Sequence, residues 1–274
     1  MGEWSGQGIW WVMDYSLVLS AFAHAFGYEK GVNVVKENVL NPVVPTVDSL
    51  ISTLTWCLEK EPEMAFIALD SGNSKRKEIY PEYKAFRERP PEYHAAYDWC
   101  LSDIRDNFSD VVQVVAADGW EADDVMASIA LEAVKQGKKC ILQSGDKDCR
   151  QCLVPGSVNM QVRKRDALGN QGWAFFTAAD AETSWGGLKV DQFIDYQILL
   201  GDDVDNIPGA PGIGEVTAVK LLKRYGSIAN MKEADIPGKT GECLKEFWKS
   251  EKMIRSLITL NSGLFHTSMQ NVNL

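Results

Sequence analysis

Apolar runs of strand length recur along the first part of the chain and alternate with segments of helical spacing. Five such runs lie at residues 9–13, 64–69, 111–115, 140–143 and 158–162. After Glu121, apolar residues recur instead at intervals of three and four, which predicts one buried face of a helix: Ala122, Val125, Met126, Ile129, Ala130 and Ala133. Strands alternating with amphipathic helices predict an α/β fold, with a central, mainly parallel sheet flanked by helices.

The pattern changes near residue 180. Beyond it, helical segments are broken by Pro and Gly, chiefly at 207–214, and no further strand is predicted. We therefore expect an α/β core at 1–179 and a helical region at 180–274. A long, charged and aromatic segment at 71–100 lies between a strand and the next helix. It predicts either an arch over a site or a solvated insertion.

Three of the predicted strands end in aspartate. Asp14 follows the first strand, Asp70 follows the second, and Asp146 and Asp148 follow the fourth. In an open parallel sheet, these side chains would project from the carboxyl edge, where such folds bind ligands. One aspartate at a strand end is ordinarily a turn former or a helix cap. Three at the same edge favour a common site.

Two further acidic groups lie elsewhere in the chain. Glu121, Asp123 and Asp124 fall in the first turn of the amphipathic helix, and this is more negative charge than a helix dipole alone favours. Glu121 and Asp124 are neighbours on one face, so they repel unless a cation lies between them. Asp202 and Asp205 open the region rich in Pro and Gly.

These groups together predict a site for several metal ions. Burying many anions in one cleft is very costly without cations, and oxygen ligands are those that Mg²⁺ and Mn²⁺ prefer. The expected ligands are Asp14, Asp70, Glu121, Asp123, Asp124, Asp146, Asp148, Asp202 and Asp205. Removing these nine from the 38 acids leaves 29, against 28 bases, so the net charge of −10 does not exclude DNA as a partner.

The remaining composition is that of a cytoplasmic protein. No apolar run approaches the roughly 18 to 20 residues that a membrane span needs. The N-terminus lacks the basic and apolar regions of a secretory signal. Six cysteines are too few for a disulfide scaffold in a chain of 274 residues. We therefore expect no membrane partner.

Several motifs, in this order along the chain, resemble the 5′ nuclease (flap endonuclease) family. This family includes the N-terminal domain of bacterial DNA polymerase I and stand-alone phage enzymes. The motifs are GWEADD at 119–124, SGDKD at 144–148, LGDDVDNIPG at 200–209, PGIGE at 211–215 and KLLKRYG at 220–226. The similarity runs from about residue 14 to about residue 264. It fits a stand-alone nuclease and a nuclease domain of a polymerase equally well.

The resemblance implies a structure-specific nuclease that cuts DNA near junctions of single and double strands. Both 5′-flap endonuclease and 5′-3′ exonuclease activity are implied, by a two-metal-ion mechanism with two or more Mg²⁺ ions, for which Mn²⁺ substitutes. The expected role is DNA replication or repair, including RNA primer removal. The expected partners are DNA with 5′ flaps, nicks or 5′ ends, and RNA–DNA hybrids, and the enzyme is expected to be a monomer. The nine carboxylates match the metal cluster of the family, with Asp146 as a catalytic residue.

The segment at 71–100 resembles the arch of the family. Lys84 and Arg87 match its tyrosine-lysine-x-x-arginine motif, whose cations contact the scissile phosphate, so both are expected to be catalytic. On a helix, their spacing would place both on one face. Lys75, Arg76 and Tyr83 are further expected DNA contacts, because aromatic residues among cations suit a single strand that stacks while its backbone is neutralised. The aromatic residues could equally pack the arch against itself.

The segment at about 200–226 resembles the helix-hairpin-helix-like (helix-three-turn-helix) motif of the family. Gly212, Ile213 and Gly214 would offer backbone N–H groups to a phosphate, and Lys220 would add charge. No side chain there suits base recognition, so binding should be independent of sequence. Similar motifs in the family hold K⁺, which makes K⁺ a second candidate ion.

Two other classes of function are compatible with parts of this sequence, and the N-terminal region departs from the pattern of the family. A non-catalytic DNA-junction binding protein would carry Asn, Ser or Ala in place of some acids, and none is seen. A PIN-class ribonuclease shares a cluster of acids at strand ends but would lack the Gly-Ile-Gly hairpin. Tyr15 stands where the family has a small residue, and Ala21, about two turns on, stands where it has a basic one. This departure bears on how a 5′ end is gripped.

Overall fold

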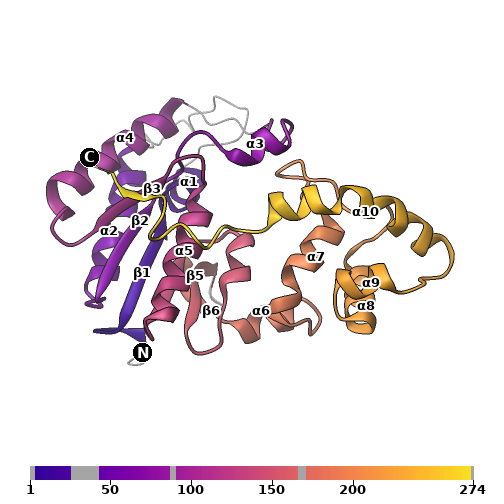
Figure 1. The fold of residues 1–274 in the computed structure, drawn as a ribbon. Coiled ribbons are helices and arrows are strands. Elements are labelled where there is room, and N and C mark those ends of the chain that lie inside the picture. The colour runs from indigo at the N-terminus through magenta and orange to yellow at the C-terminus, as the bar shows by residue number, and fades with distance from the viewer. Residues whose placement is uncertain (1–3, 26–42, 87–90, 166–170, 273–274) are drawn as a thin grey trace.

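The computed structural model describes residues 4–25, 43–86, 91–165 and 171–272. Its centre is a seven-stranded sheet with the order β6-β5-β4-β1-β2-β3-β7 (Figure 1). The strands are β1 (Ile9–Asp14), β2 (Met64–Ala68), β3 (Gln113–Ala117), β4 (Lys139–Gln143), β5 (Val158–Arg165), β6 (Gln171–Phe176) and β7 (Met269–Asn271). The strands from β5 to β3 are parallel, whereas β6 and β7 pair antiparallel at the two edges.

The strand order creates a switch point between β1 and β4. The chain runs from β1 through β2 to β3 toward one edge, and then crosses to β4 on the other side of β1. Because these four strands are parallel, their carboxyl ends lie at the same edge of the sheet. Ligands of open α/β sheets bind at such a point, where the connections diverge.

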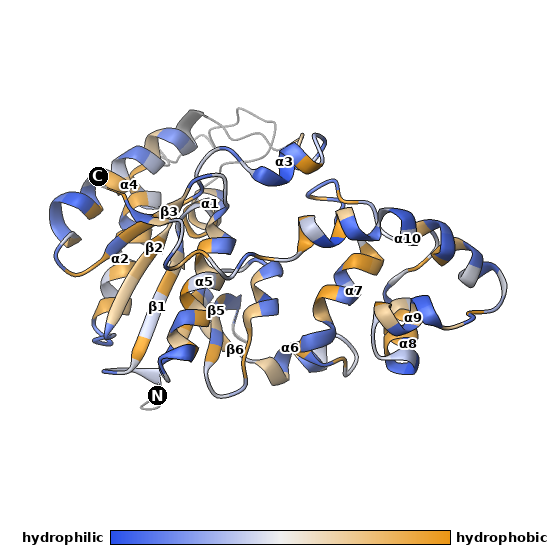
Figure 2. Cartoon of the chain, in the orientation of Figure 1, coloured by the Kyte–Doolittle hydropathy of each residue, from blue (hydrophilic) through white to orange (hydrophobic). Residues whose placement is uncertain are grey.

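Strand β1 is buried on both sides, and its alternate residues serve two cores. Trp10 and Val12 pack in the core under α5 (Ala122–Lys135), whereas Trp11 and Met13 pack in the core on the opposite face. The helices of that opposite face are α1 (Tyr15–Ala25), α2 (Val43–Leu58) and α4 (Pro91–Phe108). Figure 2 shows hydrophobic residues concentrated on the strands and hydrophilic ones on the outer helices.

The C-terminal part of the chain is helical. Its helices are α6 (Ala178–Ser184), α7 (Phe193–Leu200), α8 (Glu215–Tyr225), α9 (Ile228–Glu233) and α10 (Gly238–Ile258). They extend to one side of the sheet, and α7 contacts both α8 and α10 (Figure 1). After α10 the chain returns across the core and ends in β7 beside β3.

The predicted fold class is confirmed, and so is the helix after Glu121, whose six predicted apolar positions are all buried. The expectation of no strand beyond residue 180 is wrong, because β7 lies at 269–271. This strand has three residues, and only one is apolar, so its sequence carries no strand pattern. Within the ranges given above, no helix combines the length and the apolar character that crossing a bilayer would require.

Candidate metal centre

The carboxyl edge of the sheet brings the predicted strand-end aspartates together. Asp14 is the last residue of β1, and Asp146 lies three residues beyond β4. Ser144 joins the two across the switch point: its Oγ donates to Asp14 Oδ2 at 3.2 Å and accepts the Asp146 N–H at 3.1 Å. Asp70 follows β2 and accepts the Ala122 N–H at 3.0 Å. Asp70 is thereby anchored to the first turn of α5.

The first turn of α5 adds two carboxylates to this edge. Glu121 is the residue preceding the helix, and Asp123 lies in its first turn. The Cys149 Sγ donates to Asp123 Oδ1 at 3.2 Å. Cys149 belongs to the short 3₁₀ helix at Asp148–Cys152, so this contact connects α5 with the segment that carries Asp148.

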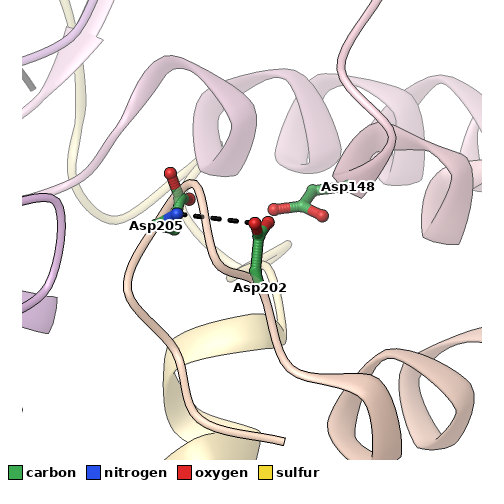
Figure 3. A group of neighbouring side chains, drawn as sticks. All are labelled: Asp148, Asp202 and Asp205. Atoms are coloured by element: carbon green, nitrogen blue, oxygen red, sulfur yellow. Dashed lines mark hydrogen bonds between the residues drawn. The ribbon is translucent and has the colours of Figure 1, made fainter. Parts of the chain in front are cut away.

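Asp148, Asp202 and Asp205 form the tightest acidic group that the described residues contain. One carboxylate oxygen from each lies within 4.8 Å of the others, and Figure 3 shows the carboxylates of Asp148 and Asp202 facing each other beside Asp205. Gln197 of α7 donates its amide to Asp148 Oδ1. The C-terminal helical part therefore completes a site that begins on the sheet.

The loop that carries Asp202 and Asp205 is closed by backbone contacts. Asp202 and Ile207 exchange backbone hydrogen bonds of 2.8 and 2.7 Å. At Gly209, an added Cβ would lie 2.1 Å from the Leu200 carbonyl oxygen. Gly201 has φ of +71°, and a Cβ there would also strike backbone atoms. The glycines of the LGDDVDNIPG motif thus permit the close approach that presents both aspartates.

Burial and mutual repulsion raise the pKa of several of these carboxyls. The pKa of Asp14 rises to about 7, chiefly because of burial and then the charge of Asp70. Burial and the charge of Asp146 also raise the pKa of Asp148 to about 7 and that of Asp123 well above its ordinary value. Burial likewise raises the pKa of Asp205. A buried, all-oxygen set of anions that repel one another fits hard divalent cations, which would offset the repulsion.

Lys84 lies at the rim of this cluster. Its Nζ is 3.0 Å from Glu121 Oε2 and 3.6 Å from Asp205 Oδ2. The backbone N–H of Lys84 donates to the backbone carbonyl oxygen of Asp205 at 3.1 Å. Burial would lower the pKa of the ammonium, but Glu121 and the other neighbouring anions raise it. Burial would also raise the pKa of Glu121, but Lys84 and Arg76 hold it below its ordinary value.

The structure differs from the expected arch in its local geometry. Residues 81–86 form turns, and Lys84 has φ of +52°, so the helix that would align Lys84 with Arg87 is absent at Lys84. Arg87, expected to be catalytic, lies outside the described residues. Lys75 begins the short helix α3 (Lys75–Ile79), with its Nζ 4.8 Å from the centre of the Trp120 ring.

Two predicted roles, those of Asp124 and Arg76, need correction. Asp124 is fully buried, and its two oxygens accept from Arg76 Nη1 and Nη2 at 2.6 and 2.8 Å. They also accept the backbone N–H groups of Glu121 and Asn261. Arg76 is 3% exposed and donates to the Leu257 carbonyl oxygen as well. This pair therefore joins α3, α5 and the end of α10, which leaves Asp124 without a free oxygen for a metal and Arg76 without a surface for DNA.

Tyr83 was predicted as a DNA contact, and its environment contradicts that role. The side chain is 3% exposed, and its hydroxyl donates to Glu121 Oε2 at 2.9 Å. Tyr83 thus packs the segment against the core and orients Glu121. By contrast, Phe86 in the same segment is 86% exposed.

The hairpin residues lie before and within α8. Gly212 and Gly214 are exposed, Ile213 is buried, and Gly214 is the residue preceding the helix. Gly212 has φ of +73°, which glycine adopts without strain. Lys220 is exposed on α8. This arrangement leaves backbone and ammonium groups accessible on one end of the helical region.

Sequence reasoning missed the polar residues that support the cluster. Ser144 and Gln197 orient Asp14 and Asp148, and Lys147 Nζ lies 3.0 Å from Asp202 Oδ2. Lys147 could have been found from its place inside the SGDKD motif. Gln197 sits in an apolar helix 49 positions from its partner, so no local pattern identifies it.

Residues 20–186 match the family model described as 5′-3′ exonuclease, N-terminal resolvase-like domain, and residues 188–273 match 5′-3′ exonuclease, C-terminal SAM fold. DNA polymerase I of Chloroflexus aurantiacus is 31% identical over 259 residues, which are 90% of this chain and 26% of that protein. The chain thus spans about a quarter of the length of this relative.

Two solved structures from bacteriophage T5 share the fold. Its 5′-exonuclease with bound zinc ions superimposes with a TM-score of 0.69 at 21% identity, covering 94% of this chain and 90% of the other. A complex of its flap endonuclease with DNA and metal ions gives a TM-score of 0.67 at 20% identity, with coverage of 94% and 90%.

Proposed function

Because this chain belongs to the 5′-3′ exonuclease family, we propose that it is a metal-dependent 5′ nuclease. It hydrolyses phosphodiesters near junctions of single-stranded and double-stranded DNA, as a 5′-flap endonuclease and a 5′-3′ exonuclease. The observation that carries the proposal is the group of eight carboxylates gathered at the switch point, several with a raised pKa, with the Lys84 ammonium at their rim.

The carboxylates would hold two or more Mg²⁺ ions, with Mn²⁺ as a substitute. The ligands would be Asp14, Asp70, Glu121, Asp123, Asp146, Asp148, Asp202 and Asp205. When bound, two such ions activate water and stabilise charge on the attacking and leaving oxygens of the phosphodiester.

Residues of the chain itself would position the substrate. Lys84 donates to the phosphate that is cleaved, where its charge stabilises the transition state. A metal ion held by Glu121 would neutralise that carboxylate, which would leave the Lys84 ammonium available for this role. Arg87 is proposed as its partner on the strength of the sequence motif alone.

The hairpin before α8 would bind the DNA duplex at some distance from the metal centre. Backbone N–H groups at Gly212 to Gly214, with Lys220, contact phosphates of the duplex without reading its sequence. A K⁺ ion at this hairpin, RNA–DNA hybrids as further substrates, a monomeric state, a cytoplasmic location and a role in replication or repair belong to the same proposal.

The two other functions considered from the sequence are less favoured. A junction binder without activity would not need eight carboxylates held in repulsion. A PIN-class ribonuclease would not account for a match to the family that extends over both the sheet domain and the helical domain.

The first experiment is cleavage of a 5′-flap duplex, compared with a blunt duplex and a single strand. We expect cutting near the flap junction in Mg²⁺ and none with a chelator. Asp146→Asn is the matched variant, expected to abolish cleavage while junction binding stays largely intact. Binding of the flap duplex by the wild type without any cutting would contradict the proposal.

A further inference from the structure

A pocket of about 270 Å³ lies beside the metal centre. Its lining includes Leu17 and Ala21 of α1, and Gly145 after β4. Gly145 directly precedes Asp146, and the Leu17 N–H donates to Asp14 Oδ1 at 2.9 Å. The pocket and the metal centre therefore share a wall. A group bound in the pocket would lie next to whatever the metal ions hold.

Two arginines face this pocket from separate elements. Arg150 comes from the 3₁₀ helix after Asp148, and Arg163 comes from β5. The Arg163 guanidinium carbon lies 4.5 Å from the centre of the Phe22 ring, and that of Arg150 lies 4.9 Å from the centre of the Phe176 ring. Stacking holds a guanidinium in place through its face and leaves the N–H donors at its edge available.

No carboxylate of the described residues lies within ion-pair distance of either arginine, although the charges of Asp146 and Asp148 act on Arg150 from farther away. Arg163 Nη2 donates to Gln171 Oε1 at 2.7 Å. Arg163 Nη1 is buried, and no acceptor for it lies in the same described part. Burial lowers the pKa of Arg163 from its ordinary value. A buried donor without an acceptor is costly, so a movement of the side chain that brings Nη1 to an anion in the pocket would remove that cost.

We propose that Arg150 and Arg163 bind a phosphate of the nucleic-acid strand, one that neighbours the phosphate being cleaved. This inference rests on the proposed function, because that function brings a strand past the shared wall. The planar guanidinium forms two parallel hydrogen bonds to phosphate oxygens, which suits this ligand. The small side chain of Ala21 leaves the room that the phosphate occupies. The phosphate is either an internal phosphodiester or a terminal 5′ phosphate, since both present the same oxygens.

The test compares the wild type with Arg163→Gln, Arg150→Gln and Arg105→Gln. Arg105 is a matched control, because it is an exposed arginine of α4 paired with Asp106 at 2.8 Å. Binding of a 5′-flap duplex is measured with a chelator, and single-turnover cleavage is measured in Mg²⁺. Loss of a hydrogen bond between charged groups predicts a fall of roughly 10- to 100-fold in kcat/KM for each pocket variant. Arg105→Gln should match the wild type.

A second set of substrates identifies the phosphate. Each linkage near the cleavage position is replaced in turn by a neutral methylphosphonate, and a nicked duplex is prepared with and without its 5′ phosphate. We expect one of these substrate changes to lower the kcat/KM of the wild type as much as Arg163→Gln does. The same substrate change should lower the kcat/KM of the Arg163→Gln variant no further. A linkage with this effect identifies an internal phosphodiester, whereas the effect of the 5′ group identifies a terminal phosphate.

Two results would overturn the inference. In the first, the pocket variants equal the wild type in binding and kcat/KM on all substrates. In the second, the loss from the arginine variant adds to the loss from the neutral linkage at every linkage tested. The thermal midpoint of unfolding shows whether each variant is folded. If Arg163→Gln is not folded, Arg163→Lys replaces it, because lysine keeps the charge without the planar guanidinium. A wild type that cleaves no flap substrate refutes the proposed function instead. In that case, the binding measurements with chelator still test whether Arg150 and Arg163 bind a phosphate of the strand.

Discussion

Individual carboxylates at the metal centre differ in what surrounds them, and this decides their roles. Asp148 and Asp123 face other acids, so their charges call for external cations. Asp124, one residue from Asp123, is satisfied by Arg76 and by two backbone N–H groups. Of these adjacent acids in one helical turn, Asp124 therefore forms a structural lock with Arg76, whereas Asp123 is proposed as a metal ligand.

The lock can be tested with Asp124→Asn. Removing one partner of a buried ion pair leaves the Arg76 charge uncompensated, which should lower the free energy of unfolding by about 3–5 kcal/mol. The measurement is urea denaturation in chelator. Asp106→Asn, in the exposed pair with Arg105, should show no measurable change. A metal ligand at Asp124 would instead give normal stability in chelator and reduced stabilisation by Mg²⁺.

Lys84 should act on the transition state more than on binding. For Lys84→Ala we expect the single-turnover rate to fall by about 10² to 10³, the cost of removing one preorganised donor, with a smaller loss of affinity for the flap duplex. Lys220→Ala is the contrasting variant, because a phosphate anchor on α8 should lose affinity and keep its rate at saturation. Equal losses in rate and affinity for Lys84→Ala would make it a plain anchor.

Among the structural elements, the loop at 201–209 depends most on its glycines. It links the C-terminal helices to the sheet, since Asp205 contacts Lys84 and Asp202 lies beside Asp148. The backbone of Gly209 lies so close to the Leu200 carbonyl group that a Cβ at Gly209 has no room. The element thus functions as a closed unit.

Gly209→Ala tests this dependence. The added Cβ would overlap the Leu200 carbonyl oxygen, and such overpacking costs about 1–3 kcal/mol or displaces the loop. We expect a lower thermal midpoint and weaker Mg²⁺ binding, measured by calorimetry. Gly172→Ala in β6 is the control, because a Cβ there meets nothing within 4 Å. An unchanged Mg²⁺ affinity in Gly209→Ala would show that the loop does not need this approach.

At the scale of the whole molecule, the site is assembled from both halves of the chain. The sheet supplies Asp14, Asp70 and Asp146, and the helical part supplies Asp202 and Asp205. Strand β7 and the Arg76–Asp124 pair then connect the end of the chain back to the core. Occupation of the centre should therefore stabilise the entire fold.

This coupling predicts a dependence of stability on pH. The folded pKa values of Asp14 and Asp148 are raised to about 7, so the folded state holds protons that the unfolded state has lost. In chelator, the free energy of unfolding should fall as pH rises from about 4 toward about 7, and level off above that. Added Mg²⁺ should raise the thermal midpoint most above pH 7 and least near pH 5. A rise in thermal midpoint on adding Mg²⁺ that is the same at every pH would contradict raised pKa values at these carboxyls.

The amino-acid sequence by itself determined the α/β class, the amphipathic helix α5 and the grouping of strand-end acids. These rest on local rules: apolar periodicity, and the convergence of parallel strands at one edge. It did not reveal β7, the turn at Lys84, the burial of Tyr83 or the pocket with Arg150 and Arg163. Asp124 shows why, because its partner Arg76 is 48 residues away, and only the packed fold brings them together. Which acids attract metal ions and which are already satisfied is thus decided by contacts distant in sequence.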